Sequence, residues 1–113
     1  AGIARQRPDF VIVQPSLPRS RAAELALAHR LPPVSAQSIF AREGGLLGYG
    51  GNSEDTFIKS AGYVDRILKG AKPADLPVQQ PTKFDLALNV RTAKRLGIDF
   101  PIALLERATE VIE

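Results

Sequence analysis

Short apolar runs alternate with helix-forming segments along the first half of the chain. Residues 10–14 read Phe-Val-Ile-Val-Gln, a β-branched run typical of a buried parallel strand. Helix formers follow at about 20–30, a short strand is predicted at 34–36, and a helical turn at 38–42 leads to another strand at 45–49. This alternation predicts an α/β fold in which helices cover both faces of a parallel sheet.

The next helix has the clearest boundaries in the chain. Asn52 or Ser53 can accept hydrogen bonds from its first amides, and acidic residues occupy its first turn, where the helix dipole favours them. Gly70 provides a C-terminal stop. One apolar stripe at helical spacing is formed by Phe57, Ala61, Val64 and Leu68. We therefore expect a helix over 53–69.

A proline-rich segment divides the chain. Residues 71–83 contain three prolines and no helical or strand period, which is typical of an extended connector. Beyond it, alternating apolar residues predict a strand at 84–90, and helices are predicted at 91–96 and 102–108. The predicted division of the chain is therefore 1–70, 71–83 and 84–113.

Composition excludes several classes of protein. The absence of Cys excludes thiol catalysis, disulfide bonds and the common structural zinc sites. The formal charge of +3 is scattered among acids, so no nucleic-acid partner is expected. No residue pattern indicates a metal site or a cofactor. There is no Met, even at position 1, so we expect the chain to be a piece of a longer protein.

Ligands of parallel sheets bind beyond the carboxyl ends of the strands. The residues predicted there, and hence the candidate ligand contacts, are Gln14, Ser16, Gln37, Tyr49 and Gly50. Gln14 and Ser16 would form hydrogen bonds, and Tyr49 would supply apolar area unless it is only a packing residue. No catalytic residue is predicted, because Ser16 lacks the glycine-flanked turn of a nucleophile and the single histidine, His29, ends a helix.

A glycine-rich loop offers an alternative. Gly48–Ser53 follows an apolar run, opens a helix and matches most of the dinucleotide fingerprint G-x-G-x-x-G. That fingerprint also needs a second strand ending in an acid about 20 residues later, and residues 70–75 form a predicted loop instead. A glycine-rich turn lining another cleft is favoured, with a nucleotide-binding, flavodoxin-like enzyme domain as the alternative.

Several segments resemble a known family. They are Glu43–Gly50 (EGGLLGYG), 61–78 (AGYVDRILKGAKPADLPV), 80–84 (QPTKF), 89–97 (NVRTAKRLG) and 107–113 (RATEVIE). Together they closely resemble the C-terminal part of ABC-transporter substrate-binding proteins of the tryptophan/tyrosine-binding type. The resemblance covers essentially the whole chain and is looser before Ala41.

The resemblance implies a periplasmic-binding-protein-like lobe of the type I, Rossmann-like kind, with three layers and a parallel sheet, present here as a fragment. Residues 1–70 would be most of the second lobe, 71–83 the crossing, and 84–113 the return to the first lobe. It further implies a non-enzymatic importer component that acts outside the cytoplasmic membrane and captures a small organic solute between two lobes for a permease.

The chain departs from the family after its first strand, where Gln14–Pro18 contains no acid to hold an amino group. An amino acid and another neutral or acidic solute therefore both stay open. The ligand-sensing lobe of a signalling receptor is a further alternative. As an isolated piece, the chain is expected to form a homodimer, because the apolar face of strand 84–90 and its open edge would lack the first lobe.

Overall fold

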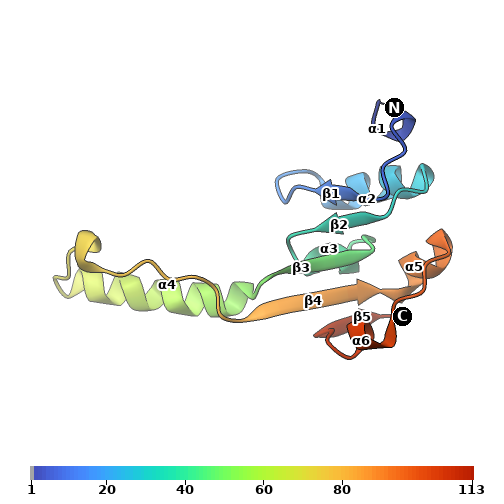
Figure 1. Ribbon diagram of the computed structural model, residues 1–113. Helices are drawn as coiled ribbons and strands as arrows, with labels where there is room; N and C mark the ends of the chain where they lie inside the picture. The colour runs from blue at the N-terminus through green and yellow to red at the C-terminus, as the bar shows by residue number, and fades with distance from the viewer. Residues whose placement is uncertain (1) are drawn as a thin grey trace. The chain divides into compact units, whose positions relative to one another are not determined.

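The computed structural model describes residues 2–113 (Figure 1). In chain order the elements are α1 (Gly2–Arg5), β1 (Val11–Val13), α2 (Arg19–Ala28), β2 (Pro33–Ser35), α3 (Ile39–Arg42), β3 (Leu47–Gly51), α4 (Ser53–Leu68), a 3-10 turn (Pro73–Asp75), β4 (Phe84–Asn89), α5 (Val90–Leu96), α6 (Ile102–Leu105) and β5 (Glu110–Ile112). The predicted alternation of strands and helices is confirmed, with one additional strand, β5.

The five strands of the described residues form one sheet in the order β1-β2-β3-β4-β5. β1 pairs parallel with β2, β2 with β3, and β4 with β5. β3 and β4 run antiparallel. Asn89 N, at the end of β4, donates to Leu46 O, just before β3, at 3.0 Å, and Asn52 N, just after β3, donates to Lys83 O, just before β4, at 2.9 Å. The amino ends of β4 and β5 therefore share a sheet edge with the carboxyl ends of β1–β3.

Contacts divide the chain into two compact units. The first, which we call the sheet unit, contains residues up to 50 together with 85–113, and the second, the helical unit, contains 51–84. The divisions predicted from the sequence, at 70 and 83, concern the lobes of a longer protein and stay a prediction. To which lobe of a longer protein each unit belongs stays a prediction.

The core of the sheet unit lies on the face of the sheet covered by α2 and α3. Phe40 is fully buried and packs with Val13 of β1 and Ala23 of α2. Both helices reach this face because consecutive parallel strands in one sheet are joined by right-handed crossovers. Ser35 Oγ donates to Val13 O at 2.8 Å, which satisfies a buried hydroxyl beside this core.

β4 is an inner strand of the sheet. It lies between β3 and β5, and Ala87 and Leu88 are fully buried. The expectation that strand 84–90 has an open edge and an exposed apolar face at Leu88 was therefore wrong, because residues 110–112 form the neighbouring strand. The homodimer expected from that open edge is supported neither by this arrangement nor by any other described feature.

Helix ends follow the sequence signals. Asn52 Oδ1 accepts from Asp55 N at 2.8 Å at the start of α4, and Asn89 Oδ1 accepts from Thr92 N at 2.9 Å at the start of α5. α5 ends at Gly97 with a φ of +71°, a left-handed conformation that glycine adopts without strain. Within residues 2–113, no helix has the length and apolar character needed to cross a membrane.

Candidate functional site

The predicted contact residues lie along one edge of the sheet unit. Gln14 and Ser16 follow β1 and are exposed, Gln37 follows β2 and is half-buried, and Tyr49 and Gly50 lie inside β3. The structure brings Gln37 and Gly50 together, since a Cβ on Gly50 would lie 3.7 Å from Gln37 Cα. Gln14 and Ser16 occupy the neighbouring turn, where Leu17 N donates to Gln14 O at 3.1 Å. Their role as ligand contacts stays a prediction.

Two glycines of β3 allow the segment after β2 to lie directly on the strand. A Cβ at Gly48 would stand 2.2 Å from the carbonyl oxygen of Gln37, and one at Gly50 would stand 2.1 Å from that of Ala36. Both contacts involve backbone, which cannot rotate away as a side chain can. The G-x-G spacing therefore has a cause in the packing of the chain itself, independent of any dinucleotide.

Arg19 connects Gln37 to Glu43. Its Nε and Nη2 donate to the two carboxylate oxygens of Glu43 at 2.5 and 3.1 Å, and its Nη1 donates to Gln37 Oε1 at 3.3 Å. Sequence reasoning missed this group. A signal was present, because a cation in the first turn of α2 is unfavourable to the helix dipole and so indicates a partner elsewhere.

The Arg19 group fixes the orientation of the Gln37 amide. The hydrogen bonds from Arg19 hold the pKa of Glu43 below its ordinary value of 4.5, and Glu43 raises the pKa of Arg19, so the pair stays ionised at neutral pH. Guanidinium is only a donor, so the oxygen of the Gln37 amide must face it. The Nε2 group then faces away, and within residues 2–113 it has no hydrogen-bond partner, so it can donate to a ligand.

Lowering the pH should weaken this group. Because the pKa of folded Glu43 lies below its ordinary value, the pair's contribution to stability is present above about pH 4.5 and is lost as the pH falls through the lower folded value. Urea unfolding of the wild type and of Glu43→Gln should therefore differ most near neutral pH and converge in acid. Asp55, whose pKa is lowered by Lys59, follows the same trend in both proteins and cancels in the comparison. A constant difference would contradict the assignment.

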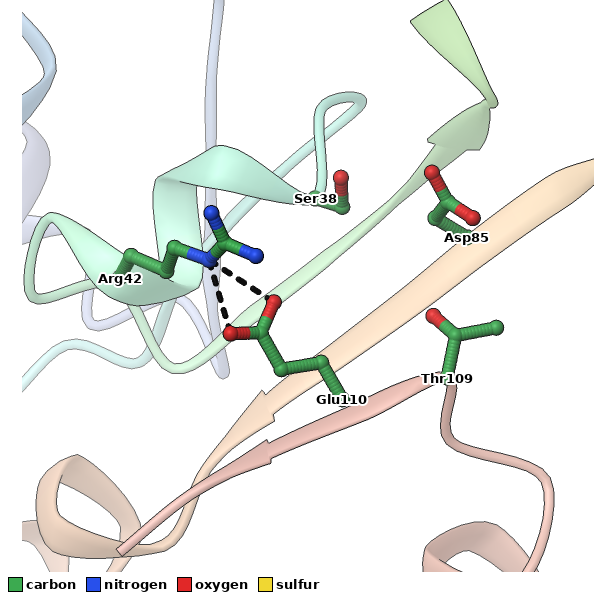
Figure 2. Close-up of a pocket in the computed structure, with 5 residues that line it drawn as sticks. All are labelled: Ser38, Arg42, Asp85, Thr109 and Glu110. Carbon is green, nitrogen blue, oxygen red and sulfur yellow. Dashed lines mark hydrogen bonds and ion pairs between the residues drawn. The ribbon is translucent and has the colours of Figure 1, made fainter. Parts of the chain in front are cut away.

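A cavity of about 370 Å³ opens at the same edge of the sheet. Its lining comes from the segment after β2, from α3 and from the first residues of β4 and β5, and consists of Ser38, Arg42, Asp85, Thr109 and Glu110 (Figure 2). Arg42 Nε donates to both oxygens of Glu110 at 2.8 and 2.9 Å, and this raises the pKa of Arg42. Thr109 Oγ1 accepts from Leu86 N at 2.9 Å, which fixes the start of β5.

The cavity can interact with both signs of charge. Arg42 pairs with Glu110 through Nε, so its two terminal nitrogens can donate to a carboxylate, and Ser38 adds a hydroxyl. Asp85 and Glu110 can accept from an ammonium group. Among the described residues, no three His, Cys, Asp or Glu side chains are grouped so as to bind a metal ion. The groups at this edge can therefore form hydrogen bonds and ion pairs with a small polar molecule.

Sequence reasoning predicted none of the residues that line the cavity, because they converge through the pairing of β4 with β3 and β5. Arg42 and Glu110 are 68 positions apart, and no local pattern shows that they meet. The reversal between β3 and β4 is what brings Asp85 and Thr109 to the edge reached by the carboxyl ends of the first three strands. The sequence analysis assigned residues 84–113 to the return to the first lobe, so it could not predict that Asp85, Thr109 and Glu110 meet residues of α3.

Comparisons with solved structures give the same fold. The chain is similar to a conserved domain protein from Vibrio cholerae O1 biovar El Tor, with 27% identity over 97% of this chain and 38% of that one and a TM-score of 0.88. It is also similar to an ABC domain from Streptococcus pneumoniae in complex with L-Trp, with 24% identity over 97% of this chain and 40% of that one and a TM-score of 0.81.

A third similar structure is the ligand-free, open form of a substrate-binding protein with adhesive properties from Clostridium difficile. It is 24% identical over 98% of this chain and 39% of that one, with a TM-score of 0.68. The chain thus spans about two-fifths of the length of these solved neighbours. The predicted α/β, periplasmic-binding-protein-like fold class is confirmed. No curated protein matches the chain.

A family model gives the assignment directly. The model of the ABC transporter substrate binding protein family matches residues 21–112, which is most of the chain. This match includes most of α2, the whole sheet after β1, and every residue that lines the cavity. The chain therefore belongs to the ABC transporter substrate-binding protein family.

Proposed function

We propose that this chain is part of the solute-binding component of an ABC importer, which captures a small organic solute between two lobes and delivers it to a membrane permease. Membership of the family supports a solute-binding role. The protein would act outside the cytoplasmic membrane and would catalyse no reaction. The observation that carries the proposal is the edge of the sheet unit, where a fixed amide donor and a charged cavity lie at the carboxyl ends of β1–β3.

The proposed solute site combines predicted and newly found residues. Gln37 would donate from Nε2, Gln14 and Ser16 would add hydrogen bonds from the turn after β1, and Tyr49 would contribute apolar area beside Gly50. The cavity's volume of about 370 Å³ falls at the lower end of the range for small-molecule sites, about 300–1,000 Å³. A solute of amino-acid size fits these dimensions.

The charges at this edge favour a solute that carries a carboxylate and an amino group. Gln37 Nε2 and Arg42 are donors for the carboxylate. Asp85 and Glu110 supply the acids that the segment after β1 lacks. One similar structure contains L-Trp, which supports amino acids as the first solutes to test.

The test is calorimetric titration of the full-length protein with amino acids, organic acids and nucleotides. Replacing Gln37 with glutamate keeps the side chain's size, removes the donor and places a negative charge beside the solute's acceptor. The affinity for a carboxylate-bearing solute should then fall about tenfold or more, because a net hydrogen bond contributes roughly 0.5–1.5 kcal/mol and charge repulsion adds to its loss.

Gln6→Glu is the matched control, since Gln6 is exposed and precedes β1, and it should leave the affinity unchanged. An unchanged affinity in Gln37→Glu would move the site elsewhere. Saturable binding of a nucleotide, with none of any amino acid or organic acid, would contradict the importer proposal and favour the nucleotide-binding alternative.

A further inference from the structure

The proline-rich segment that follows α4 packs against the polar face of this helix. Lys59 Nζ donates to Thr82 Oγ1 at 2.7 Å, and the Tyr63 hydroxyl donates to Pro77 O. Asp55 forms ion pairs with Lys59 at 2.7 Å and with Lys83 at 3.4 Å. The proline-rich return segment of the helical unit thus packs along the side of α4 that carries charged and hydroxyl groups.

The apolar face of α4 is left exposed. The stripe predicted from the sequence consists of Phe57, Ala61, Val64 and Leu68, all exposed, with Phe57 at 75% and Leu68 at 82%. No described residue of α4 is buried. At about 100° per residue, Phe57 lies roughly 200° around the helix from both Asp55 and Lys59, which is the opposite side. This arrangement inverts the usual one, in which a helix buries its apolar stripe.

We propose that the apolar stripe of α4 docks onto the part of a longer protein that residues 1–113 do not contain, so that the helical unit folds with that part. The solved neighbours support this occupant, because 97% or more of this chain aligns to only 38–40% of each of their chains. The inference rests on the proposed two-lobed protein but is independent of which solute it binds.

A second copy of the chain fits the stripe less well. A stable dimer buries about 800 Å² on each partner. An aromatic side chain such as Phe57 buries about 150–250 Å², and the three aliphatic members of the stripe are smaller, so one stripe alone supplies less than a dimer needs. Its occupant must extend over more of the helical unit, as the remainder of one folded chain would.

The experiment compares acidic substitutions on the two faces of α4 in the full-length protein. Phe57→Asp and Leu68→Asp should each lower the unfolding midpoint by roughly 5 °C or more, because a docked apolar side chain would be replaced by a buried charge. Gly62→Asp is the matched control, because Gly62 lies on the side of α4 away from the stripe and an added Cβ there would meet no neighbouring atom within 4 Å. It should not lower the midpoint. Phe57→Ala provides a milder variant if the acidic ones fail to accumulate.

Hydrogen exchange and sedimentation complete the test. Amides of α4 should be protected in the wild-type full-length protein and should exchange faster in Phe57→Ala. Equal, small shifts on both faces would overturn the proposal by showing that the stripe is exposed to solvent. A wild-type dimer that Phe57→Ala converts to a monomer would also overturn it, in favour of a second copy. Solute affinity is measured separately, so failure of the proposed solute site would leave these readouts unaffected.

Discussion

Replacing Asn89 with leucine should destabilise the protein by about 2–4 kcal/mol. Asn89 is buried, its Nδ2 donates to Ala41 O at 2.8 Å, and its Oδ1 accepts from Thr92 N at 2.9 Å. Leucine has a similar volume but can satisfy neither group. The substitution therefore removes the cap of α5 and leaves the buried carbonyl of α3 without this donor, and each loss costs of the order of 1 kcal/mol or more.

Urea-induced unfolding, followed by circular dichroism, measures this loss. Asn52→Leu is the matched control, since Asn52 caps α4 in the same way but is only half-buried. It should cost about 1 kcal/mol, the usual value for a lost cap. Equal losses in the two variants would show that the bond from Asn89 to α3 contributes nothing beyond capping.

Truncating Phe40 to alanine should have a larger effect, a loss of about 3–5 kcal/mol in the free energy of unfolding. Phe40 of α3 is fully buried against α2 and the sheet, in contact with Val13 and Ala23. A Cβ at Gly45 would lie 2.2 Å from its ring, so the backbone itself closes one side of the site. A close-packed site of this kind cannot collapse easily, and the truncation leaves a cavity.

The Phe40 variant should also weaken solute binding, because α3 carries Arg42 and begins directly after Ser38. Unfolding curves and calorimetric titration of the same samples measure the two effects. Phe10→Ala is the control, since Phe10 is 54% exposed and its truncation should cost less than about 1 kcal/mol. A Phe40→Ala protein as stable as the wild type would mean that the core lies elsewhere.

Local signals predicted the elements well, and the reason is visible at the helix ends. Asn52 and Asn89 cap helices through amides only three residues away, so a short stretch of sequence contains both partners. The apolar runs of β1, β2 and β3 can likewise be recognised from a few consecutive residues. Gly97, which directly follows the helix predicted at 91–96, ends α5 in a left-handed conformation that few other residues adopt easily.

Pairing across the sheet could not be predicted in the same way. β5 contains only three residues, too few for a strand period to appear, and its partner β4 lies more than twenty positions earlier. Arg19 and Glu43 are 24 positions apart, and Arg42 and Glu110 are 68 apart. Gln37 could be placed at the edge because it follows a strand, whereas the charged residues around it depend on strand order, which one sequence does not determine.

The close contact of Gly48 and Gly50 with the segment after β2 limits how this site can diversify. Any side chain at either position would displace the backbone that carries Gln37. In the proposed solute site, new preferences would therefore arise by changing Gln14, Ser16 or Gln37, whose side chains extend from turns, with both glycines of the strand kept. A combinatorial library built to alter solute preference should randomise those three positions and leave both glycines unchanged.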